Sequence, residues 1–268
     1  MTAMTAMKTR IGLIGYGTIG NAVHRMIDSD PKNGMEISFI HDADSSRLTD
    51  LAPNLVLSDL ADFESRDVDL VVEMAHPDVS RQWATRILRK TDYMFISVTA
   101  LADKALEESL KATTLEHSTR AYLPHGGGVG VDALLESRDI WEEVSVVMKK
   151  PPGNIDCLAA GIDPGSITAE TVLYDGSARD ICPMFPRNVN TIATIAYASL
   201  GFDRTNAKLV VNPDWNTAVV ALHARAPGVD LRVERSEVIS GVTGAGTPAS
   251  IYNSIQMIGS KGPGIHIR

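Results

Sequence analysis

The first 125 residues of the chain alternate short apolar runs with stretches of helical spacing. The runs are continuous, as in strands that a parallel sheet buries on both faces. Between them, segments such as 21–27 and 102–110 place apolar residues three and four positions apart. This alternation predicts an α/β fold on a doubly wound parallel sheet. The predicted strands are Ile11–Ile14, Met35–Asp42, Val68–Ala75, Tyr93–Val98 and Ala121–Pro124.

The pattern changes after residue 125, where strand-like runs follow one another with fewer helical segments between them. Helices are predicted at 189–200, with Asn188 as N-cap, and at 247–258, with Pro248 near its start. We predict a second, α+β domain on an open mixed sheet. Residues 7–125 plus 246–268 form the first domain, and 126–245 the second. The predicted strands of the second are Val144–Met148, Thr171–Tyr174, Lys208–Val211, Val219–Ala224 and Leu231–Glu234.

The first predicted strand runs into a glycine-rich turn and then a helix. In the pattern Gly-x-Gly-x-x-Gly, Gly15 permits a sharp turn, Gly17 lets a pyrophosphate approach the backbone, and Gly20 lets helix and strand pack closely. The helix N-terminus then faces the phosphates. The turn predicts a dinucleotide site formed by Gly15, Tyr16, Gly17, Thr18, Ile19 and Gly20.

An acidic residue, Asp42, ends the second predicted strand about 20 residues after the last glycine of the turn. A carboxylate there binds the adenosine ribose hydroxyls and repels a 2′-phosphate, which favours NAD. Ser45, Ser46 and Arg47 follow directly, and they offer groups that hold such a phosphate. The sequence therefore leaves NAD and NADP open as cofactors.

Composition narrows the classes of partner. The 268-residue chain is 44% hydrophobic, yet no run reaches the roughly 18–20 apolar residues of a membrane span. With no signal peptide recognisable, we expect a cytoplasmic protein that binds no membrane. The net charge of −8 and scattered basic residues argue against nucleic acid. Cys157 and Cys182, the only cysteines, lack the spacing of a zinc site, so no metal is predicted.

Polar and basic residues accumulate before the helix predicted at 189–200. The segments Gly176-Ser-Ala-Arg179 and Phe185-Pro-Arg-Asn-Val-Asn190 carry two arginines and two asparagines. One interpretation is a set of caps and turns. The other is a site in which Arg179 or Arg187 clamps a carboxylate of a small anionic substrate, while Asn188 and Asn190 contact the cofactor.

These segments resemble the L-aspartate dehydrogenase family, which joins a Rossmann domain to a small substrate domain. The resemblance extends over nearly the whole chain from Met7. It includes the glycine turn, Ser97-Val-Thr-Ala-Leu-Ala-Asp103 and His125-Gly-Gly-Gly-Val-Gly-Val-Asp132. The resemblance implies NAD(P)-dependent interconversion of L-aspartate with iminoaspartate, or with oxaloacetate plus ammonia, and thereby a link to NAD biosynthesis or aspartate catabolism. A homodimer is expected by analogy of fold.

One position departs from the family pattern. The family carries a histidine, taken to be catalytic, where this chain has Ala218, and alanine transfers no proton. His223 is five residues further along, so in a strand its side chain is on the opposite face. His125, at a strand end, is the candidate for general acid/base catalysis. A histidine that is merely hydrogen-bonded in a turn is the alternative.

The remaining candidates surround the same crevice. Gly126 and Gly128 offer backbone N–H groups to the substrate, and Gly127 is assigned to the cofactor. Ala75 and His76 follow a strand end and are assigned to the cofactor, although His76 also has the position of a helix cap. Because of Ala218, two other functions stay open. One is a related dehydrogenase of another amino or oxo acid, and the other is a catalytically silent NAD(P)-binding protein.

Overall fold

Five parallel strands form the sheet of the N-terminal half, in the order β2-β1-β3-β4-β5. A computed structural model describes residues 8–240 and 243–259 of the chain. Strand order reverses between β1 and β3, and open α/β sheets bind ligands at the carboxyl ends beside such a switch point. The strands are β1 (Thr9–Ile14), β2 (Met35–His41), β3 (Leu70–Glu73), β4 (Asp92–Phe95) and β5 (Ala121–Tyr122).

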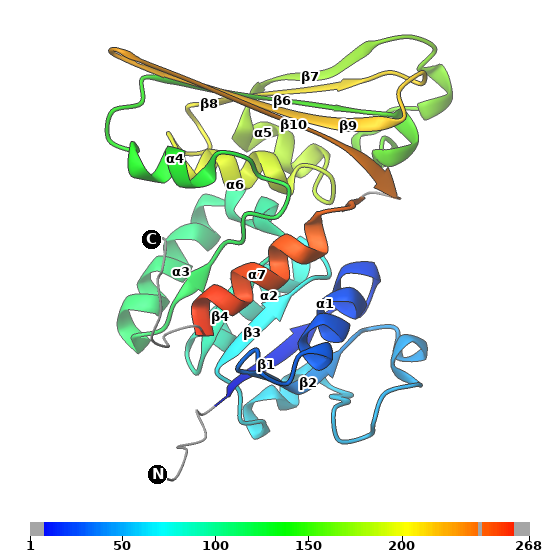
Figure 1. The fold of residues 1–268 in the computed structure, drawn as a ribbon, viewed down its shortest axis with the longest axis vertical. Coiled ribbons are helices and arrows are strands. Elements are labelled where there is room, and N and C mark those ends of the chain that lie inside the picture. Colours follow the sequence, from blue (N-terminus) through cyan, green and yellow to red (C-terminus); the bar gives the residue numbers. More distant parts are fainter. Residues whose placement is uncertain (1–7, 241–242, 260–268) are drawn as a thin grey trace.

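Helices cover both faces of this sheet. On one face the C-terminal helix returns from the second half and lies beside α1, where Ile251 and Ile255 join Ile11, Leu13 and Val23 in one core (Figure 1). The helix predicted at 247–258 is therefore present, and it packs on α1 of the first half. The helices are α1 (Thr18–Ser29), α2 (Pro77–Leu88), α3 (Lys104–His117) and α7 (Thr247–Gly259).

The second sheet has the order β11-β10-β9-β6-β8-β7. Only β6 and β8 pair in parallel, so the sheet is mixed and open, as predicted. Helices α4 (Val131–Glu136), α5 (Ala178–Met184) and α6 (Asn190–Ala198) lie between this sheet and the first half (Figure 1). The strands are β6 (Glu143–Lys150), β7 (Thr171–Ser177), β8 (Thr205–Val211), β9 (Thr217–Ala226), β10 (Val229–Ser240) and β11 (Thr243–Gly244).

Short 3₁₀ helices fill the connections, and one of them joins the two halves. Helix η3 (Val98–Ala102) follows β4, and the Thr99 N–H donates to Asn190 Oδ1 at 3.1 Å. Thr99 Oγ1 also donates to the carbonyl of Pro186 at 2.7 Å. The others are η1 (Ser45–Leu48), η2 (Leu60–Ser65), η4 (Pro152–Asn154), η5 (Leu158–Ala160) and η6 (Pro164–Ser166).

The fold class is confirmed, with two differences in local structure. Helix α5 occupies a stretch interpreted as turns, because Pro183 and its polar flanks conceal a helix that Ser177 caps and that buries Ile181. Asn188 does not cap α6, whose N-cap is Val189 without a side-chain hydrogen bond. The predicted domain boundaries stay a prediction, and residues 7, 241–242 and 260–268 within them lie outside the described residues.

Candidate active site

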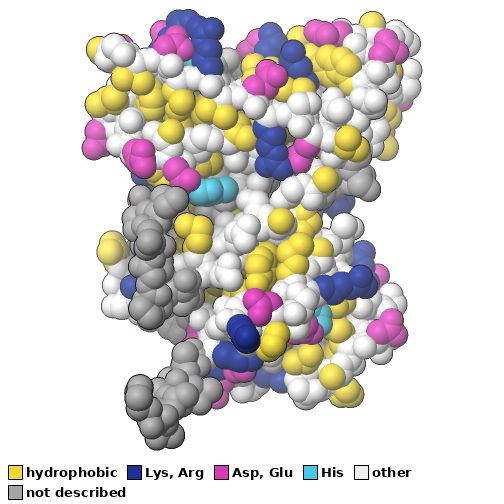
Figure 2. Space-filling model, in the orientation of Figure 1, with side chains coloured by type: hydrophobic (Ala, Val, Ile, Leu, Met, Phe, Trp, Pro, Cys, Tyr) yellow, Lys and Arg dark blue, Asp and Glu magenta, His cyan; other side chains and the backbone are white. Residues whose placement is uncertain are grey.

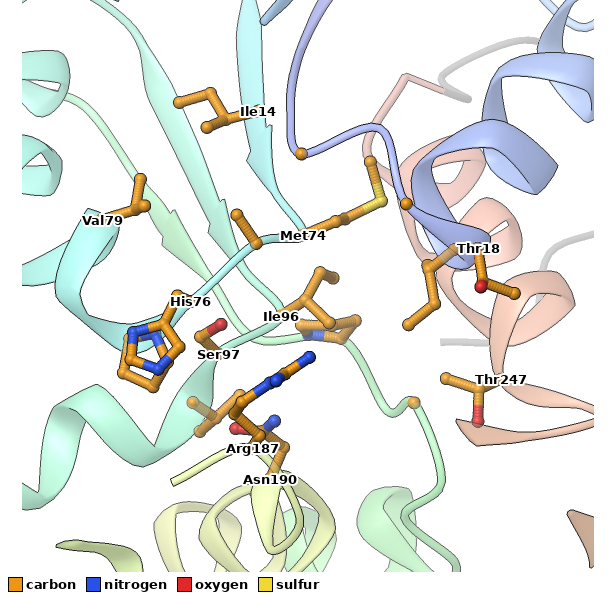
Figure 3. Close-up of a pocket in the computed structure, with 18 of the residues that line it drawn as sticks. Ile14, Thr18, Met74, His76, Val79, Ile96, Ser97, Arg187, Asn190 and Thr247 are labelled. Atoms are coloured by element: carbon orange, nitrogen blue, oxygen red, sulfur yellow. The ribbon is translucent and has the colours of Figure 1, made fainter. Parts of the chain in front are cut away.

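A cavity of about 830 Å³ lies between the two halves, at the carboxyl ends of β1, β3 and β4. Figure 3 shows His76, Ile96 and Ser97 on the side of the first sheet, with Arg187 and Asn190 approaching from the second half. On the face in Figure 2, basic side chains are interspersed with acidic ones. No helix among the described residues is long and apolar enough to cross a membrane.

The glycine turn at one end of this cavity fits a pyrophosphate. Gly15 has φ +96°, and a Cβ there would lie 2.7 Å from the carbonyl oxygen of Met74. A Cβ on Gly17 would meet only Arg47 within 4 Å, so the space in front of it is open. Because no side chain caps α1, the first N–H groups of the helix stay available, and Thr18 and Ile19 line the cavity.

Two other residues of the turn, Tyr16 and Gly20, contact the protein interior rather than the cavity. Tyr16 is buried, and its hydroxyl lies 2.8 Å from His24 Nδ1, so only its backbone serves the turn. Burial raises the pKa of the Tyr16 hydroxyl. Gly20 packs against the carbonyl of Gly15, which leaves no room for a Cβ. Neither residue lines the cavity, and both support the shape of the turn that does.

Asp42 and Arg47 lie together beside the glycine turn, at the end of the cavity where the adenosine is predicted to bind. Asp42 Oδ2 accepts a hydrogen bond from the Tyr16 N–H at 2.6 Å and lies 3.4 Å from Arg47 Nη1. Both side chains line the cavity, together with Asp59. The carboxylate suits ribose hydroxyls, and the guanidinium suits a 2′-phosphate, so the cavity fits NAD or NADP.

Glu73, which sequence reasoning missed, organises the strand ends at the other end of the cavity. It is fully buried and accepts hydrogen bonds from the N–H groups of Ala75 and Ser97 and from the hydroxyls of Ser97 and Ser80. Desolvation raises the pKa of the Glu73 carboxyl, and these four hydrogen bonds lower it in part. A glutamate inside an otherwise apolar strand run was the available signal.

The predicted cofactor residues Ala75 and His76 both line the cavity. The N–H of Ala75 is already donated to Glu73 Oε1 at 2.7 Å. His76 caps α2, because its Nδ1 accepts from the Asp78 N–H at 3.3 Å, and its side chain remains 40% exposed. His76 therefore both caps α2 and lines the cavity, and its assignment to the cofactor stays a prediction.

His125 lines the cavity from the loop that precedes α4. Its Nε2 lies 3.4 Å from Asp132 Oδ1, and its side chain is 37% exposed. Gly126 and Gly127 line the cavity as well, whereas Gly128 does not, and the Gly128 N–H donates to the carbonyl of His125 at 2.7 Å. Of the two glycines assigned to the substrate, the structure brings only Gly126 to the cavity.

The two candidate arginines have different surroundings. Arg187 is exposed, lines the cavity and forms no ion pair with any other described residue (Figure 3). Arg179 lies outside the lining, with Nε 2.6 Å from Asp203 Oδ1, a bond from Nη1 to the Ala102 carbonyl, and the Phe202 ring 5.3 Å away. The structure therefore brings Arg187, and not Arg179, to the site.

The two asparagines both line the cavity, and both also hold backbone in place. Asn188 Oδ1 accepts from the Asp156 N–H at 3.0 Å, and its Nδ2 donates to the carbonyl of Asn154. Asn190 Oδ1 accepts from Thr99 at the junction of the halves. Each asparagine therefore shapes the wall of the cavity, and their contact with the cofactor stays a prediction.

The second sheet supplies the floor of the cavity. Lys150, Ala218 and Glu237 line this side of the cavity, which we call its floor, and Ala218 is 4% exposed. Sequence reasoning missed Lys150, which reads as an ordinary surface lysine at a strand end but is 7% exposed. His223 is on the opposite face of β9, as predicted, with Nε2 3.1 Å from Asp230 Oδ1.

The cysteines take no part in the cavity. Cys157 and Cys182 are both buried, and burial raises the pKa of the Cys182 thiol to about 12. Within residues 8–240 and 243–259, no group of three or more His, Cys, Asp or Glu side chains is arranged to hold a metal ion.

Comparison with known proteins assigns both halves. Residues 15–124 match the family described as homoserine dehydrogenase, NAD binding domain, and residues 132–258 match aspartate dehydrogenase, C-terminal. An L-aspartate dehydrogenase of Methanosarcina mazei is 33% identical over 214 residues, covering 76% of this chain and 79% of that protein. The chain belongs to the aspartate dehydrogenase family.

Similarity to other members of the aspartate dehydrogenase family extends over the full length. An aspartate dehydrogenase domain-containing protein of Danio rerio is 29% identical over 273 residues, covering 96% of this chain and 98% of that protein. The crystal structure of aspartate dehydrogenase from Thermotoga maritima superimposes with a TM-score of 0.72, at 22% identity, over 96% of this chain and 99% of that one. The fold of that structure therefore extends over 96% of this chain.

Proposed function

We propose that this member of the family is an NAD(P)-dependent L-aspartate dehydrogenase. It would interconvert L-aspartate with iminoaspartate, or with oxaloacetate plus ammonia. The observation that carries the proposal is that one cavity contains both the glycine turn at Gly17 and the side chain of Arg187. Among the described residues, Arg187 has no ion-pair partner. When bound, the nicotinamide ring exchanges a hydride with Cα of the substrate.

The residues of the chain bind and orient the reactants. Arg187 is proposed to hold a substrate carboxylate through charge-assisted hydrogen bonds, aided by the N–H of Gly126. Gly127, Asn188 and Asn190 are proposed to shape the wall against the nicotinamide. His125, at the edge of the same cavity, is proposed as a proton-transfer group that exchanges with solvent.

Because position 218 is alanine, two alternative functions must be compared with the proposed one. A chain without the usual histidine would suit a different 2-amino or 2-oxo acid, or would bind NAD(P) without turnover. Arg187, which forms no ion pair with another described residue, favours an anionic substrate over a neutral one. Aspartate therefore remains the proposed substrate.

The proposal is tested by NAD(P)H formation at alkaline pH with L-aspartate, beside glutamate, alanine and serine. We expect turnover with aspartate well above that with the other three, and a lower rate in His125→Ala. Cofactor binding without turnover of aspartate would contradict the proposal. Preferred turnover of another amino acid would replace aspartate as the substrate while leaving the hydride chemistry in place.

The wider setting is proposed from the same family. We expect a cytoplasmic enzyme whose product, iminoaspartate, links it to NAD biosynthesis or to aspartate catabolism. A homodimer is proposed through the face of the second sheet that the helices leave uncovered. That face carries Val147, Val172, Val219 and Val238, of which Val172 and Val238 are 50% and 69% exposed.

A further inference from the structure

Lys150 is a buried lysine at the inner end of β6. Burial alternates along this strand, so Lys150 shares the inner face with Met148, while Lys149 points to the other face. Lys150 lines the active-site cavity and is 7% exposed, whereas Lys149 Nζ lies 5.9 Å from the ring of Trp215. Two adjacent lysines of one strand therefore sit in opposite environments.

The register of the sheet places Lys150 beside Ala218. The antiparallel β6–β9 ladder ends with the pair Lys149 and Val219, so the next step of this register sets Lys150 against Ala218. On the other side of β9, Glu237 of β10 pairs directly with Ala218. Lys150, Ala218 and Glu237 thus form one row across the sheet, and all three line the cavity.

The side chain at the centre of this row is the smallest of the three. Ala218 stands at the position of the family's histidine. Its small side chain leaves an open space between the side chains of Lys150 and Glu237. Glu237 is fixed there, because its Oε2 accepts from Arg235 Nη2 at 2.6 Å and from the Gly246 N–H at 3.3 Å. The Lys150 side chain is therefore the polar group that borders the space above Ala218 from the other side.

The charges around Lys150 come from several elements. Glu237 of β10 is its charged neighbour, itself paired with Arg235, and Arg187, His125 and His76 line the same cavity. The remaining titratable lining residues, His41, Asp42, Arg47 and Asp59, belong to the adenosine end. Burial lowers the pKa of Lys150 to about 8, and the nearby carboxylate of Glu237 raises it in part.

We propose that Lys150 is a catalytic residue that accepts a proton from the substrate's amino group, which would bind in the open space above Ala218. This inference rests on the proposed aspartate dehydrogenase function. Neutral Nζ takes one proton from the α-ammonium group, so an N–H bond breaks and an Nζ–H bond forms. The freed nitrogen lone pair forms the C=N bond as the Cα hydrogen leaves with its electron pair to the nicotinamide.

Burial separates the role of Lys150 from that of His125. The side chain of His125 is 37% exposed, and its Nε2 lies 3.4 Å from Asp132 Oδ1, so His125 stands at the solvent-facing edge of the cavity. Lys150 lies on the closed side, where a neutral amine is available near pH 8. In the reverse direction, the Lys150 ammonium returns the proton to the substrate nitrogen, as general acid/base catalysis requires.

Three variants separate proton transfer from charge. Lys150→Met is expected to lower kcat for aspartate oxidation about 100-fold or more, within the usual range for loss of a general base. Lys150→Arg keeps the charge without a basic lone pair, so kcat stays low while KM remains near that of the wild type. Lys149→Met, the matched control on the opposite face, leaves kcat unchanged. Recovery of kcat in Lys150→Arg would overturn the proposal.

The pH dependence supplies a second readout. Wild-type kcat for oxidation is expected to rise as pH passes about 8, because the base must lose its proton first. In a Lys150→Met background, Ala218→His is expected to restore part of kcat and to move the midpoint towards about 6.5, the ordinary value for histidine. An unchanged midpoint in Lys150→Met would overturn the assignment.

A titration without turnover tests Lys150 separately from the proposed function. Lysines of the full chain are dimethylated with ¹³C-formaldehyde, and Lys150 is assigned by its absence from Lys150→Arg. We expect its resonance to titrate near 8, well below the ordinary value for a lysine. A Lys150 midpoint near 10 overturns the inference. Failure of the wild type to oxidise aspartate contradicts the proposed function instead, and the two failures are distinguishable.

Discussion

Arg179 and Arg187 show how the surroundings of a residue decide its role. Both belong to the family's arginine-bearing segments, and the sequence offered either as the carboxylate clamp. The guanidinium of Arg179 is 17% exposed and already neutralised by Asp203. Arg187 extends into the cavity without an ion pair to any described residue. A free guanidinium gains most from an incoming carboxylate.

Substituting each arginine is expected to separate binding from stability. Arg187→Ala raises KM for aspartate about 10- to 100-fold, the loss of charge-assisted hydrogen bonds. Arg179→Ala leaves KM within about threefold but lowers the free energy of unfolding by about 1–2 kcal/mol, because the Ala102 carbonyl loses its partner and Asp203 keeps only Lys104. Steady-state kinetics and urea titration measure both. The opposite assignment of effects would make Arg179 the clamp.

Lys150 is expected to make stability depend on pH. Its folded pKa, about 8, lies below its ordinary value of 10.5. Between these values the unfolded chain binds a proton that the folded chain does not, so stability rises with pH there, and below 8 the full burial cost remains.

Lys150→Met should therefore raise the free energy of unfolding at pH 7 by about 2–3 kcal/mol, and the gain should fade as pH approaches 10.5. Urea titrations of both proteins across pH 7 to 10 measure this difference. Lys149→Met is the control, with no pH-dependent change expected. A variant that is less stable than the wild type at pH 7 would contradict a buried, depressed lysine.

At the scale of elements, the sequence predicted the parts whose signals are local. The turn at Gly15 and Gly17, the apolar strands and the returning helix α7 all follow from periodicity and glycine spacing. Helix α5 did not, because its apolar residues are few and Pro183 lies inside it. Its stability comes from burial against η3 of the first half and against α6, β7 and β8, which no local pattern reveals.

The site was predicted where a motif carried it and missed where only packing did. The glycine turn, Asp42, His125 and Arg187 were named from motifs and line the cavity. Glu73 and Lys150 belong to no motif, and their importance arises from burial of a charge in a folded interior. The long-range register between β6 and β9 that puts Lys150 beside Ala218 is not visible in either strand alone.

The short helix η1 is expected to set the choice of cofactor. It carries Arg47 at its end, beside Gly17 and Asp42. Arg47→Leu should weaken NADPH binding about tenfold or more, because a 2′-phosphate loses its cation, while NADH binding changes less than about threefold. Fluorescence titration with each cofactor measures this, with Arg81→Leu on α2 as control. Equal weakening of both cofactors would assign Arg47 to the pyrophosphate instead.

At the scale of the whole molecule, the two halves share one hydrophobic core that runs from Phe95 and Val98 into α5 and α6. Helix η3 adds polar bonds across the same junction, through Thr99 and Ala102. Packing between the halves, rather than a linker, therefore sets the position of the glycine turn relative to the second sheet. The cavity is a product of both halves, and neither half alone contains it.

The uncovered sheet face is expected to form the dimer. Light scattering should give a mass of about twice the 28.8 kDa of the chain. Val219→Arg, at the centre of that face, should shift the protein towards monomer by burying a charge. Leu115→Arg, on an exposed position of α3, is the control and should leave the mass unchanged. A dimer that tolerates Val219→Arg would use another surface.

The most direct test of the central claim follows the atoms of one turnover. Oxaloacetate, ¹⁵N-ammonium and NADH or NADPH carrying deuterium at C4 are incubated with the protein, and the products are identified by mass spectrometry. An aspartate dehydrogenase yields aspartate with ¹⁵N and with deuterium at Cα. Deuterium recovered in malate, or cofactor bound without any labelled product, would contradict the assignment.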